Sequence, residues 1–218
     1  LQTDPRLPTG RVQVTIEAGE PAYDIVCPAA WDAIEAPTRE RSGSPPCALL
    51  YHGSLALRSG PSRRACQSLR EAGPGTVFVD VNLRPPWWDR ERVLELLRGA
   101  HWVKLNQDEL ERLDRGDGRA FLRSLGLRGL LLTNGSHGAR LLTADGAHHE
   151  VRPAGGVEVV DTVGAGDALA AVMILGLLRG WPLGLTLVRA QAFASAIVGQ
   201  RGATVCDRAF YDPFIAQF

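Results

Sequence analysis

The sequence lacks a charge imbalance, a long apolar run and a paired cysteine motif. Its 218 residues carry 24 Lys and Arg against 24 Asp and Glu, so no global charge would draw the protein to nucleic acid or to a membrane surface. No apolar run approaches the length that crosses a bilayer, and residues 1–10 show no signal-peptide pattern. These absences predict a protein with no nucleic-acid partner and no membrane partner.

The cysteines are few and isolated. They are Cys27, Cys47, Cys66 and Cys206, and none forms a CxxC pair. Isolated cysteines are more typical of small buried apolar side chains than of metal ligands or disulfide halves. We therefore expect all four to be buried, in a reducing and cytoplasmic setting.

What is present is an ordinary globular composition with 45% hydrophobic and 22% charged residues. Short apolar runs alternate with helical patterns, which predicts parallel βαβ units and an α/β sheet covered on both faces. Residues 11–27 alternate around a Gly-Glu-Pro break, which indicates two strands joined by a turn. The remaining predicted strands are 48–51, 76–81, 101–105, 127–133, 139–143 and 148–152, and the predicted helices are 62–72, 88–97, 107–113, 117–125, the run after residue 167, 183–198 and 207–218.

The most informative stretch is Val159–Leu178, VVDTVGAGDALAAVMILGLL. Its first valines are typical of the end of a buried strand, and its apolar run is typical of a helix. At a helix start the first N–H groups have no intrahelical partner, and the small residues Gly164, Ala165 and Gly166 would let an anion approach them closely. Asp167 would lie beside that anion, where a carboxylate is suited to moving a proton. The alternative is a plain tight turn followed by an acid that the helix dipole favours.

Polar side chains also follow two earlier predicted strands. Asn82 and Arg84 are two residues apart in what we expect to be extended chain, so both side chains would face one direction. The Arg84 guanidinium could donate hydrogen bonds to a phosphate or a sugar hydroxyl. Asn106 and Glu109 are one helical turn apart. The alternatives are that Asn82 caps a turn while Arg84 pairs with a surface acid, and that Asn106 and Glu109 form an ordinary capping box.

The string TNGSHGA, residues 133–139, places Gly135 and Gly138 beside the hydroxyl of Thr133. Glycines there would allow close backbone approach to a phosphate. Neither this string nor residues 164–166 is a P-loop, because no Gly-Lys-Ser/Thr follows. We give His137 no role and expect it to be exposed.

Taken together, D-T-x-G-A-G-D (161–167), D-x-N-x-R (80–84), N-x-x-E (106–109) and T-x-G-x-x-G (133–138) resemble motifs of the ribokinase-like (PfkB) carbohydrate kinases, and of bacterial fructokinases in particular. The resemblance implies a three-layer α/β/α sandwich with a mostly parallel central sheet and a small β lid. It also implies transfer of the ATP γ-phosphate to a sugar hydroxyl, with fructose as the expected sugar.

The resemblance assigns roles to individual residues. Asp167 would be the general base, and Gly164, Ala165 and Gly166 would form the anion hole. Asn82, Arg84 and Tyr23 would bind the sugar together with Asp167. The ATP-binding residues would be Asn106, Glu109, Thr133, Gly135, Gly138, Gly164 and Gly166, with Glu109 holding Mg²⁺ through water.

A monovalent cation, K⁺ in our expectation, would lie beside the anion hole. The family supplies backbone carbonyls near the end of the penultimate helix and the first Asp of the D-T-x-G-A-G-D motif. The alternative is that Gly202 is merely a helix stop. The candidate cation ligands are Asp161, Val163, Ile197, Gln200 and Gly202.

We predict that residues 1–218 form a single ribokinase-like domain that is N-terminally incomplete, since no counterpart of the family's N-terminal Gly-Gly segment is found. Residues 11–27 would be the β lid, through which a homodimer could form. Such a chain would bind ATP without turning over. Alternative activities are a 2-keto-3-deoxygluconate kinase, a ribokinase and a non-catalytic nucleotide-binding remnant. A dinucleotide oxidoreductase is disfavoured, because no G-x-G-x-x-G follows the first strand.

Overall fold

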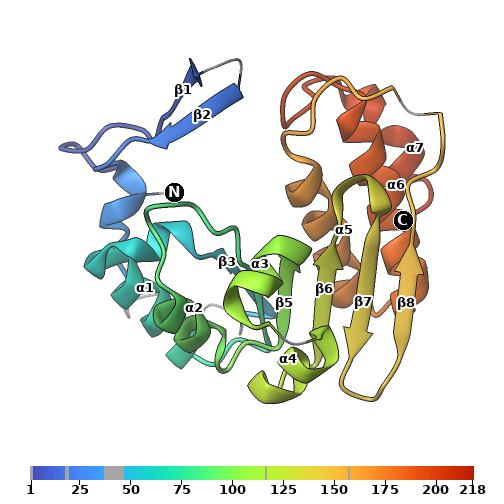
Figure 1. Cartoon of the computed structure of the whole chain (residues 1–218), viewed down its shortest axis with the longest axis horizontal. Coiled ribbons are helices and arrows are strands. Elements are labelled where there is room, and N and C mark those ends of the chain that lie inside the picture. The colour runs from blue at the N-terminus through green and yellow to red at the C-terminus, as the bar shows by residue number, and fades with distance from the viewer. Residues whose placement is uncertain (1, 18–19, 37–46, 116, 157) are drawn as a thin grey trace.

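The structure is a computed structural model that describes residues 2–17, 20–36, 47–115, 117–156 and 158–218. Its larger sheet has six strands in the order β3-β4-β5-β6-β7-β8 (Figure 1). The pairs from β3 to β6 are parallel, and β7 and β8 continue the sheet antiparallel. The strands are β3 (Leu49–Gly53), β4 (Thr76–Asp80), β5 (Trp102–Asn106), β6 (Gly129–Thr133), β7 (Ala139–Thr143) and β8 (His148–Val151).

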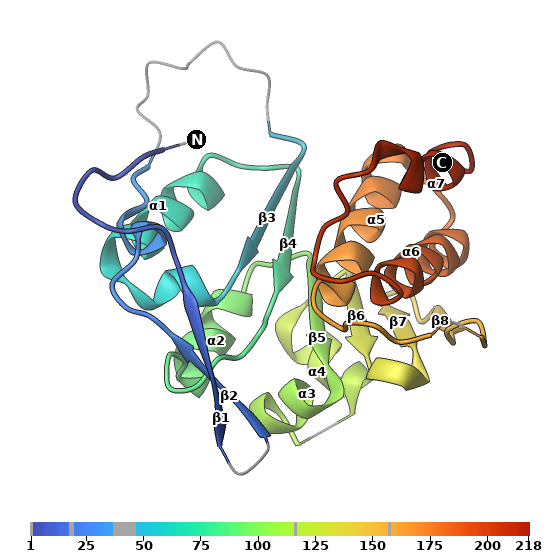
Figure 2. The same ribbon diagram turned by 90° about the horizontal axis from the view of Figure 1, so that it is seen from above.

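Helices cover both faces of this sheet, with α1 to α4 on one side and α5 and α6 on the other (Figure 2). The mostly parallel α/β/α sandwich is therefore confirmed. Among the described helices, none combines the length and the apolar character that a membrane span requires. The helices are α1 (Gly60–Glu71), α2 (Arg90–Leu97), α3 (Gln107–Leu113), α4 (Gly118–Leu125), α5 (Ala165–Arg179), α6 (Leu183–Val198) and α7 (Asp212–Ile215), with short 3₁₀ turns η1 (Ala30–Ala33), η3 (Leu55–Arg58), η4 (Gly135–His137) and η5 (Arg208–Phe210).

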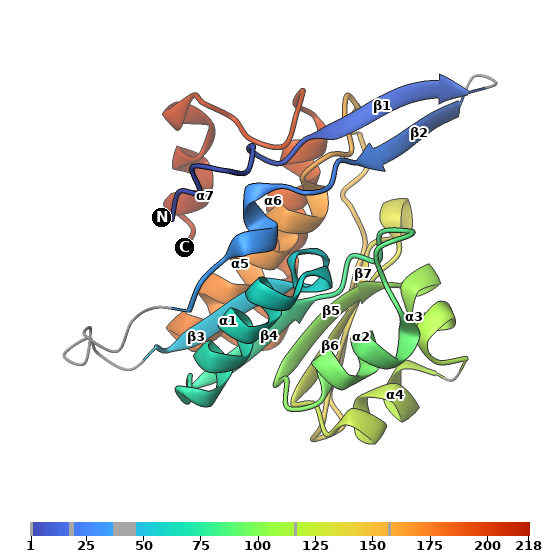
Figure 3. The same ribbon diagram turned by 90° about the vertical axis from the view of Figure 1, so that its left-hand side faces the viewer.

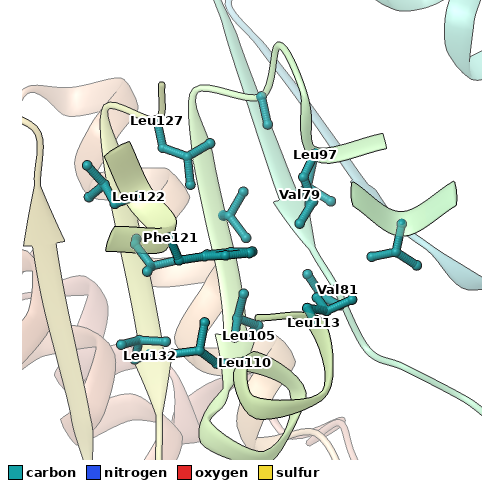
Figure 4. Packing of buried hydrophobic residues seen from close by; sticks show 14 of the residues in the cluster. Val79, Val81, Leu97, Leu105, Leu110, Leu113, Phe121, Leu122, Leu127 and Leu132 are labelled. Carbon is teal, nitrogen blue, oxygen red and sulfur yellow. The ribbon is translucent and has the colours of Figure 1, made fainter. Parts of the chain in front are cut away.

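Two hydrophobic cores lie on opposite faces of the sheet. The first is formed by alternate residues of β4 to β6 and by α2 to α4, with Phe121 and Leu97 fully buried at its centre (Figure 4). The second lies under α5 and α6 and contains Phe78, Trp102 and Leu131. Successive residues of a strand point to opposite faces, so one short apolar strand supplies both cores.

The strands predicted within residues 11–27 form a second sheet. β1 (Val12–Glu17) and β2 (Glu20–Ile25) pair antiparallel, with Val12 opposite Ile25. Among the described residues no strand pairing joins this two-stranded sheet to the larger one, and it stands off from it (Figure 3). The side chain of Tyr23 lies outside the part of the chain that the structure describes, so its predicted place near the sugar remains a prediction, as do the lid and dimer roles.

The strand predicted to end at Val160 is absent. Val159 and Val160 are 66% and 55% exposed and are not paired to the sheet. Instead the N–H groups of Val160 and Asp161 both donate to the carbonyl of Val198, at 3.0 and 3.1 Å. The β-branched pair is therefore tied to the last residue of α6 rather than to a strand, and the turn that follows is positioned by helix α6.

The prediction for the cysteines was also wrong in three cases. Cys66 in α1 is buried, but Cys27, Cys47 and Cys206 are exposed. The exposed three lie in connecting segments outside the helices and strands, where no neighbouring layer covers them.

Candidate active site

The turn before α5 is shaped by a glycine that no other residue could replace without strain. Gly164 is the N-cap of α5 and has φ = +85°, in the left-handed region. A Cβ atom there would lie 2.6 Å from the Cα atom of Ala203, so the turn packs directly on the backbone that follows α6. The glycine therefore fixes where the helix begins.

Asp167 lies in the first turn of α5, and its side chain is exposed. The N–H groups of the first helical turn have no carbonyl partner within the helix, and they lie at the positive end of its dipole. Gly166 supplies one of them next to the Asp167 carboxylate, and the Ala165 N–H makes a long bond of 3.4 Å to the Thr162 carbonyl just before the helix. The turn thus presents anion-binding donors and a possible proton acceptor within one short segment.

A buried ion pair lies beneath this turn. The Nζ atom of Lys104 in β5 is 2.7 Å from Oδ2 of Asp80, the last residue of β4, and both side chains are buried. The two residues are register partners on neighbouring parallel strands. A Cβ atom on Gly166 would lie 3.2 Å from the same Nζ atom, so the ammonium contacts the start of α5.

The electrostatics of the pair are unusual for a salt bridge. Burial raises the pKa of the Asp80 carboxyl above its usual value, against the lowering effect of Lys104, and the Asp167 charge raises it further. The hydroxyl of Tyr51 in β3 lies 3.5 Å from Asp80 Oδ2. Partial burial, and then the charges of Asp80 and Asp167, raise the pKa of that hydroxyl as well. The charge of Asp167 therefore acts on both Asp80 and Tyr51.

The Asn82–Arg84 segment does not have the predicted geometry. Asn82 has φ = +47°, in the left-handed region, so the chain turns here and the expectation of an extended segment was wrong. The bend is held on both sides, because the Val81 N–H donates to the carbonyl of Lys104 at 2.9 Å and the Leu83 N–H donates to Glu109 Oε1 at 2.7 Å. Asn82 is half-buried at the bend, while the Arg84 side chain is exposed.

Asn106 and Glu109 form the capping box that was one of the two predictions for them. Asn106 Oδ1 accepts the Glu109 N–H at 2.8 Å, and Glu109 Oε2 accepts the Asn106 N–H at 2.9 Å. Glu109 is buried and holds the Leu83 N–H with its other oxygen. Its carboxylate thus organises two loops at the carboxyl ends of β4 and β5. A contact to Mg²⁺ would use the lone pairs that remain and would run through water.

The Thr133–Gly138 loop closes on itself at the end of β6. The Asn134 N–H donates to the Gly138 carbonyl at 2.8 Å, and η4 lies between them. Gly138 has φ = +94°, and a Cβ atom there would collide with the carbonyl oxygen of Val151, so only glycine fits. A cavity of about 580 Å³ lies beside this loop, with Arg140 and Arg152 in its wall. The predicted exposure of His137 is confirmed.

Asp161 ties the turn before α5 to the loop after α6. Its Oδ1 accepts the Val163 N–H at 2.9 Å and its Oδ2 accepts the Gly202 N–H at 3.0 Å. These bonds, that from Val163 first, lower the pKa of the Asp161 carboxyl. Helix α6 ends before this loop, at Val198, so Gly202 is not its stop, although its φ of +82° is left-handed.

The cation ligands remain a prediction. The Ile197 carbonyl accepts the N–H groups of Gly199 and Gln200, the second at 2.9 Å, and Asp161 orders the backbone nearby. A cluster of backbone oxygens suits a hard monovalent cation better than a transition metal. The described residues contain no group of three or more His, Cys, Asp or Glu side chains that could hold a metal ion.

Apart from Tyr23 on β2 and the cation candidates at and after the end of α6, the predicted residues lie on segments at the carboxyl ends of β4, β5 and β6 and at the start of α5. The strands are parallel, so their carboxyl ends lie at one edge of the sheet. The sequence interpretation gave no role to Lys104 or Tyr51, and it named Asp80 only as part of the D-x-N-x-R string. One signal was available for Lys104, because WVKLN places a lysine inside an otherwise apolar strand.

A family model described as pfkB family carbohydrate kinase matches residues 46–209. The chain belongs to the pfkB family of carbohydrate kinases. It is 39% identical over 142 residues to an aminoimidazole riboside kinase of Salmonella typhimurium, covering 59% of this chain and 44% of that protein. It is 34% identical over 153 residues to a fructokinase of Salmonella thompson, covering 63% of this chain and 67% of that protein. The chain spans about half the length of most of the curated relatives that it matches.

Solved structures share the fold. An aminoimidazole riboside kinase of Salmonella enterica, complexed with aminoimidazole riboside and an ATP analog, superposes with a TM-score of 0.77 at 28% identity, over 99% of this chain and 75% of that one. A fructokinase of Vibrio cholerae, in a form with fructose, ADP and potassium ion bound, superposes with a TM-score of 0.75 at 23% identity, over 96% of this chain and 74% of that one. The second likeness shows the fold alone.

Proposed function

We propose that the protein is an ATP-dependent carbohydrate kinase that transfers the γ-phosphate to a sugar hydroxyl. The observation that carries the proposal is the turn at the start of α5. There an exposed Asp167 follows the small residues Ala165 and Gly166, and the left-handed Gly164 holds the turn against the segment after α6. Membership in the pfkB family supports the reaction class.

In this mechanism Asp167 accepts the proton of the acceptor hydroxyl as the oxygen attacks phosphorus. General-base catalysis of this kind contributes about 10²–10⁴-fold. The N–H groups at the start of α5 stabilise the charge that develops on the transferred phosphoryl group, since they are fixed in place before the reaction. The turn therefore acts on both reactants, with Asp167 on the sugar hydroxyl and the N–H groups on the phosphoryl group of ATP.

The nucleotide would lie along the Thr133–Gly138 loop, where nothing lies within 4 Å of the Cβ position of Gly135, and beside the exposed Asn106 side chain. Mg²⁺ would neutralise phosphate charge, with Glu109 acting through water from its buried position. K⁺ would be held by Asp161 and the backbone oxygens near it, and would add fixed positive charge beside the anion hole.

Fructose is the acceptor that we propose, with Asn82, Arg84 and Tyr23 contacting it. The similarity to an aminoimidazole riboside kinase makes a riboside the competing acceptor. The test assays residues 1–218 and the longest reading frame that contains them, with ATP, Mg²⁺ and K⁺. The acceptors would be fructose, ribose, 2-keto-3-deoxygluconate and aminoimidazole riboside. We expect ATP-dependent phosphorylation of fructose by the longer protein. ATP binding without transfer to any acceptor would contradict the proposal and favour the non-catalytic alternative.

A further inference from the structure

Lys104 is a buried lysine on an apolar face of the sheet. Along β5 it follows Trp102 on the side that α5 and α6 cover, and its register partner on β6 is Leu131. The residue is only 5% exposed. A buried ammonium is unfavourable unless it is paired, so a lysine at this position needs an explanation beyond packing.

The partner of Lys104 is itself incompletely satisfied. Asp80 Oδ2 accepts the Lys104 hydrogen bond at 2.7 Å, and the Tyr51 hydroxyl lies 3.5 Å away. The other carboxylate oxygen, Oδ1, is buried and has no hydrogen-bond partner among the described residues, while the Asn82 side chain also acts on this carboxyl and lowers its pKa. An ammonium has three N–H donors, and Asp80 receives one of them within the described part of the chain. The pair is therefore not a closed structural unit.

The start of α5 lies directly over the ammonium. A Cβ atom on Gly166 would be 3.2 Å from Nζ of Lys104 and 3.9 Å from its Cε. The N-terminus of a helix carries partial positive charge, so a cation beneath it is unfavourable when nothing else is bound. The same arrangement adds to the positive potential of the anion-binding N–H groups. An anion above the turn would relieve the repulsion between the two positive groups.

We propose that Lys104 is a positioning residue of the phosphoryl-transfer site, whose buried ammonium, oriented by Asp80, supports the turn of Gly166 and Asp167 from beneath and strengthens its attraction for phosphate. The inference rests on the proposed kinase function, because phosphate is the anion that this function brings to the turn. Gly166 fits the same account, since the absence of a side chain lets the ammonium approach the helix start.

The chain offers a matched control. Arg58 and Asp32 form a second buried pair at 2.8 Å, with side chains 6% and 8% exposed. This pair joins η1 and η3 and makes no contact with α5 among the described hydrogen bonds. Its loss should affect the stability of the protein but not its affinity for phosphate.

The experiment compares Lys104→Met, Asp80→Asn, the double variant and Arg58→Met in the longest frame that contains the chain. Calorimetry measures the affinity for Mg·ATP, steady-state assays give kcat and KM for the sugar, and thermal melts give Tm. We expect Lys104→Met to lower kcat by about 10²-fold, the scale of a misplaced reacting group, and to weaken ATP binding, with little change in KM for the sugar. Asp80→Asn keeps the ammonium and gives it a neutral acceptor, so it should cost kcat less.

The double variant, Lys104→Met with Asp80→Asn, distinguishes the effect of losing the Lys104 charge on catalysis from the effect of a buried unpaired charge on stability. Removing both charges should restore Tm toward the wild-type value, because no unpaired charge remains buried. We expect its kcat and ATP affinity to stay as low as those of Lys104→Met, while Arg58→Met lowers Tm and leaves both unchanged. Recovery of wild-type kcat in the double variant would overturn the inference, as would a Lys104→Met protein with wild-type kcat and ATP affinity. If the wild type phosphorylates no sugar, the proposed function fails, and equal ATP affinities for wild type and Lys104→Met would overturn the inference separately.

Discussion

The Asp32–Arg58 and Asp80–Lys104 pairs are alike in length and in the low exposure of their side chains, but Asp80 lies deeper in the protein, and the pKa values of the two carboxyls are shifted in opposite directions. Asp32 receives two hydrogen bonds from the Arg58 guanidinium, each 2.8 Å, and a third from the Ala29 N–H at 2.9 Å. These bonds, those from Arg58 first, lower the pKa of Asp32. The pKa of Asp80 is raised, first by burial.

The difference separates a structural pair from a functional one. Asp32 is bonded through both oxygens, and the Arg58 guanidinium also lies 4.4 Å from the centre of the Trp87 ring. The Asp32 carboxylate is thus fully bonded, although Arg58 Nη1, like Asp80 Oδ1, is buried without a hydrogen-bond partner among the described residues. Asp80 keeps an unpartnered oxygen, and Lys104 faces the helix start that carries Asp167. Perturbed ionisable groups that are only partly satisfied cluster at functional sites, and this pair fits that pattern.

The largest effect is expected from Asp167, whose charge acts on Asp80 of the Asp80–Lys104 pair. Asp167→Asn should lower kcat by about 10²–10⁴-fold while leaving Tm and ATP affinity nearly unchanged, because an exposed amide replaces an exposed carboxylate. Asp32→Asn is the control, since it should lower Tm and leave kcat intact. Equal turnover by Asp167→Asn and the wild type would remove Asp167 from the role of base.

Arg58→Met tests the structural pair directly. It leaves the Asp32 carboxylate buried without its guanidinium, a change that typically costs about 3–5 kcal/mol of unfolding free energy. Urea unfolding measures the loss, and a steady-state assay on the folded variant should return the wild-type kcat. A fall in kcat without a change in stability would show that this pair, too, serves the active site.

Gly164→Ala should disturb the turn above Lys104. The left-handed backbone alone costs about 1–3 kcal/mol for a residue with a side chain, and the new Cβ atom would meet the Ala203 backbone. The helix start should shift, with a loss of both stability and ATP affinity. Gly180→Ala is the matched control at the other end of α5, because Gly180 is also left-handed at φ = +67° but nothing lies within 4 Å of its Cβ position. It should lower stability alone.

The smallest expected effect is the difference between Asp32 and Asp80 in how each makes the free energy of unfolding depend on pH. Asp32 has a pKa below 3.8 in the folded protein, so its contribution to stability is present above pH 3.8 and is lost as the pH falls through the folded value. Asp80 has a pKa above 3.8 in the folded protein, so as the pH falls its carboxyl is protonated in the folded state before it is protonated in the unfolded state. This difference increases the free energy of unfolding as the pH falls toward 3.8. Unfolding free energies measured from pH 6 to about pH 3 should fall less steeply for Asp32→Asn than for the wild type, and more steeply for Asp80→Asn. Parallel curves would contradict the difference between the two pairs.

Local sequence patterns predicted most of the fold, because helices and short buried strands are specified by residues close together in the chain. Asp89 and Asp117 each accept a backbone N–H at a helix start, and Gly126 ends α4 in the left-handed region. Each such signal acts within one helical turn. The strands β3 to β8 and helices α1 to α6 therefore lie within a few residues of their predicted bounds.

The errors fall where a distant segment decides the backbone. Val159 and Val160 have strand-like side chains, but their segment is bonded to the end of α6 and pairs with no strand of the described sheet. Asn82 has a left-handed backbone because the neighbouring N–H groups are held by Lys104 and Glu109, more than 20 residues away. Local periodicity carries no information about such contacts.

By itself the sequence determined the order of the elements and the family motifs, including Asp167 in a glycine turn, since these depend on neighbouring residues. The tertiary structure alone decided which charged side chains meet. Asp80 and Lys104 are 24 residues apart, and the parallel register of β4 and β5 makes them partners. Gly166 is far from both in the chain, and the packing of α5 on the sheet places it against Nζ of Lys104. A lysine within an apolar strand shows that a partner is needed, but only packing identifies the carboxylate and the helix start that surround it.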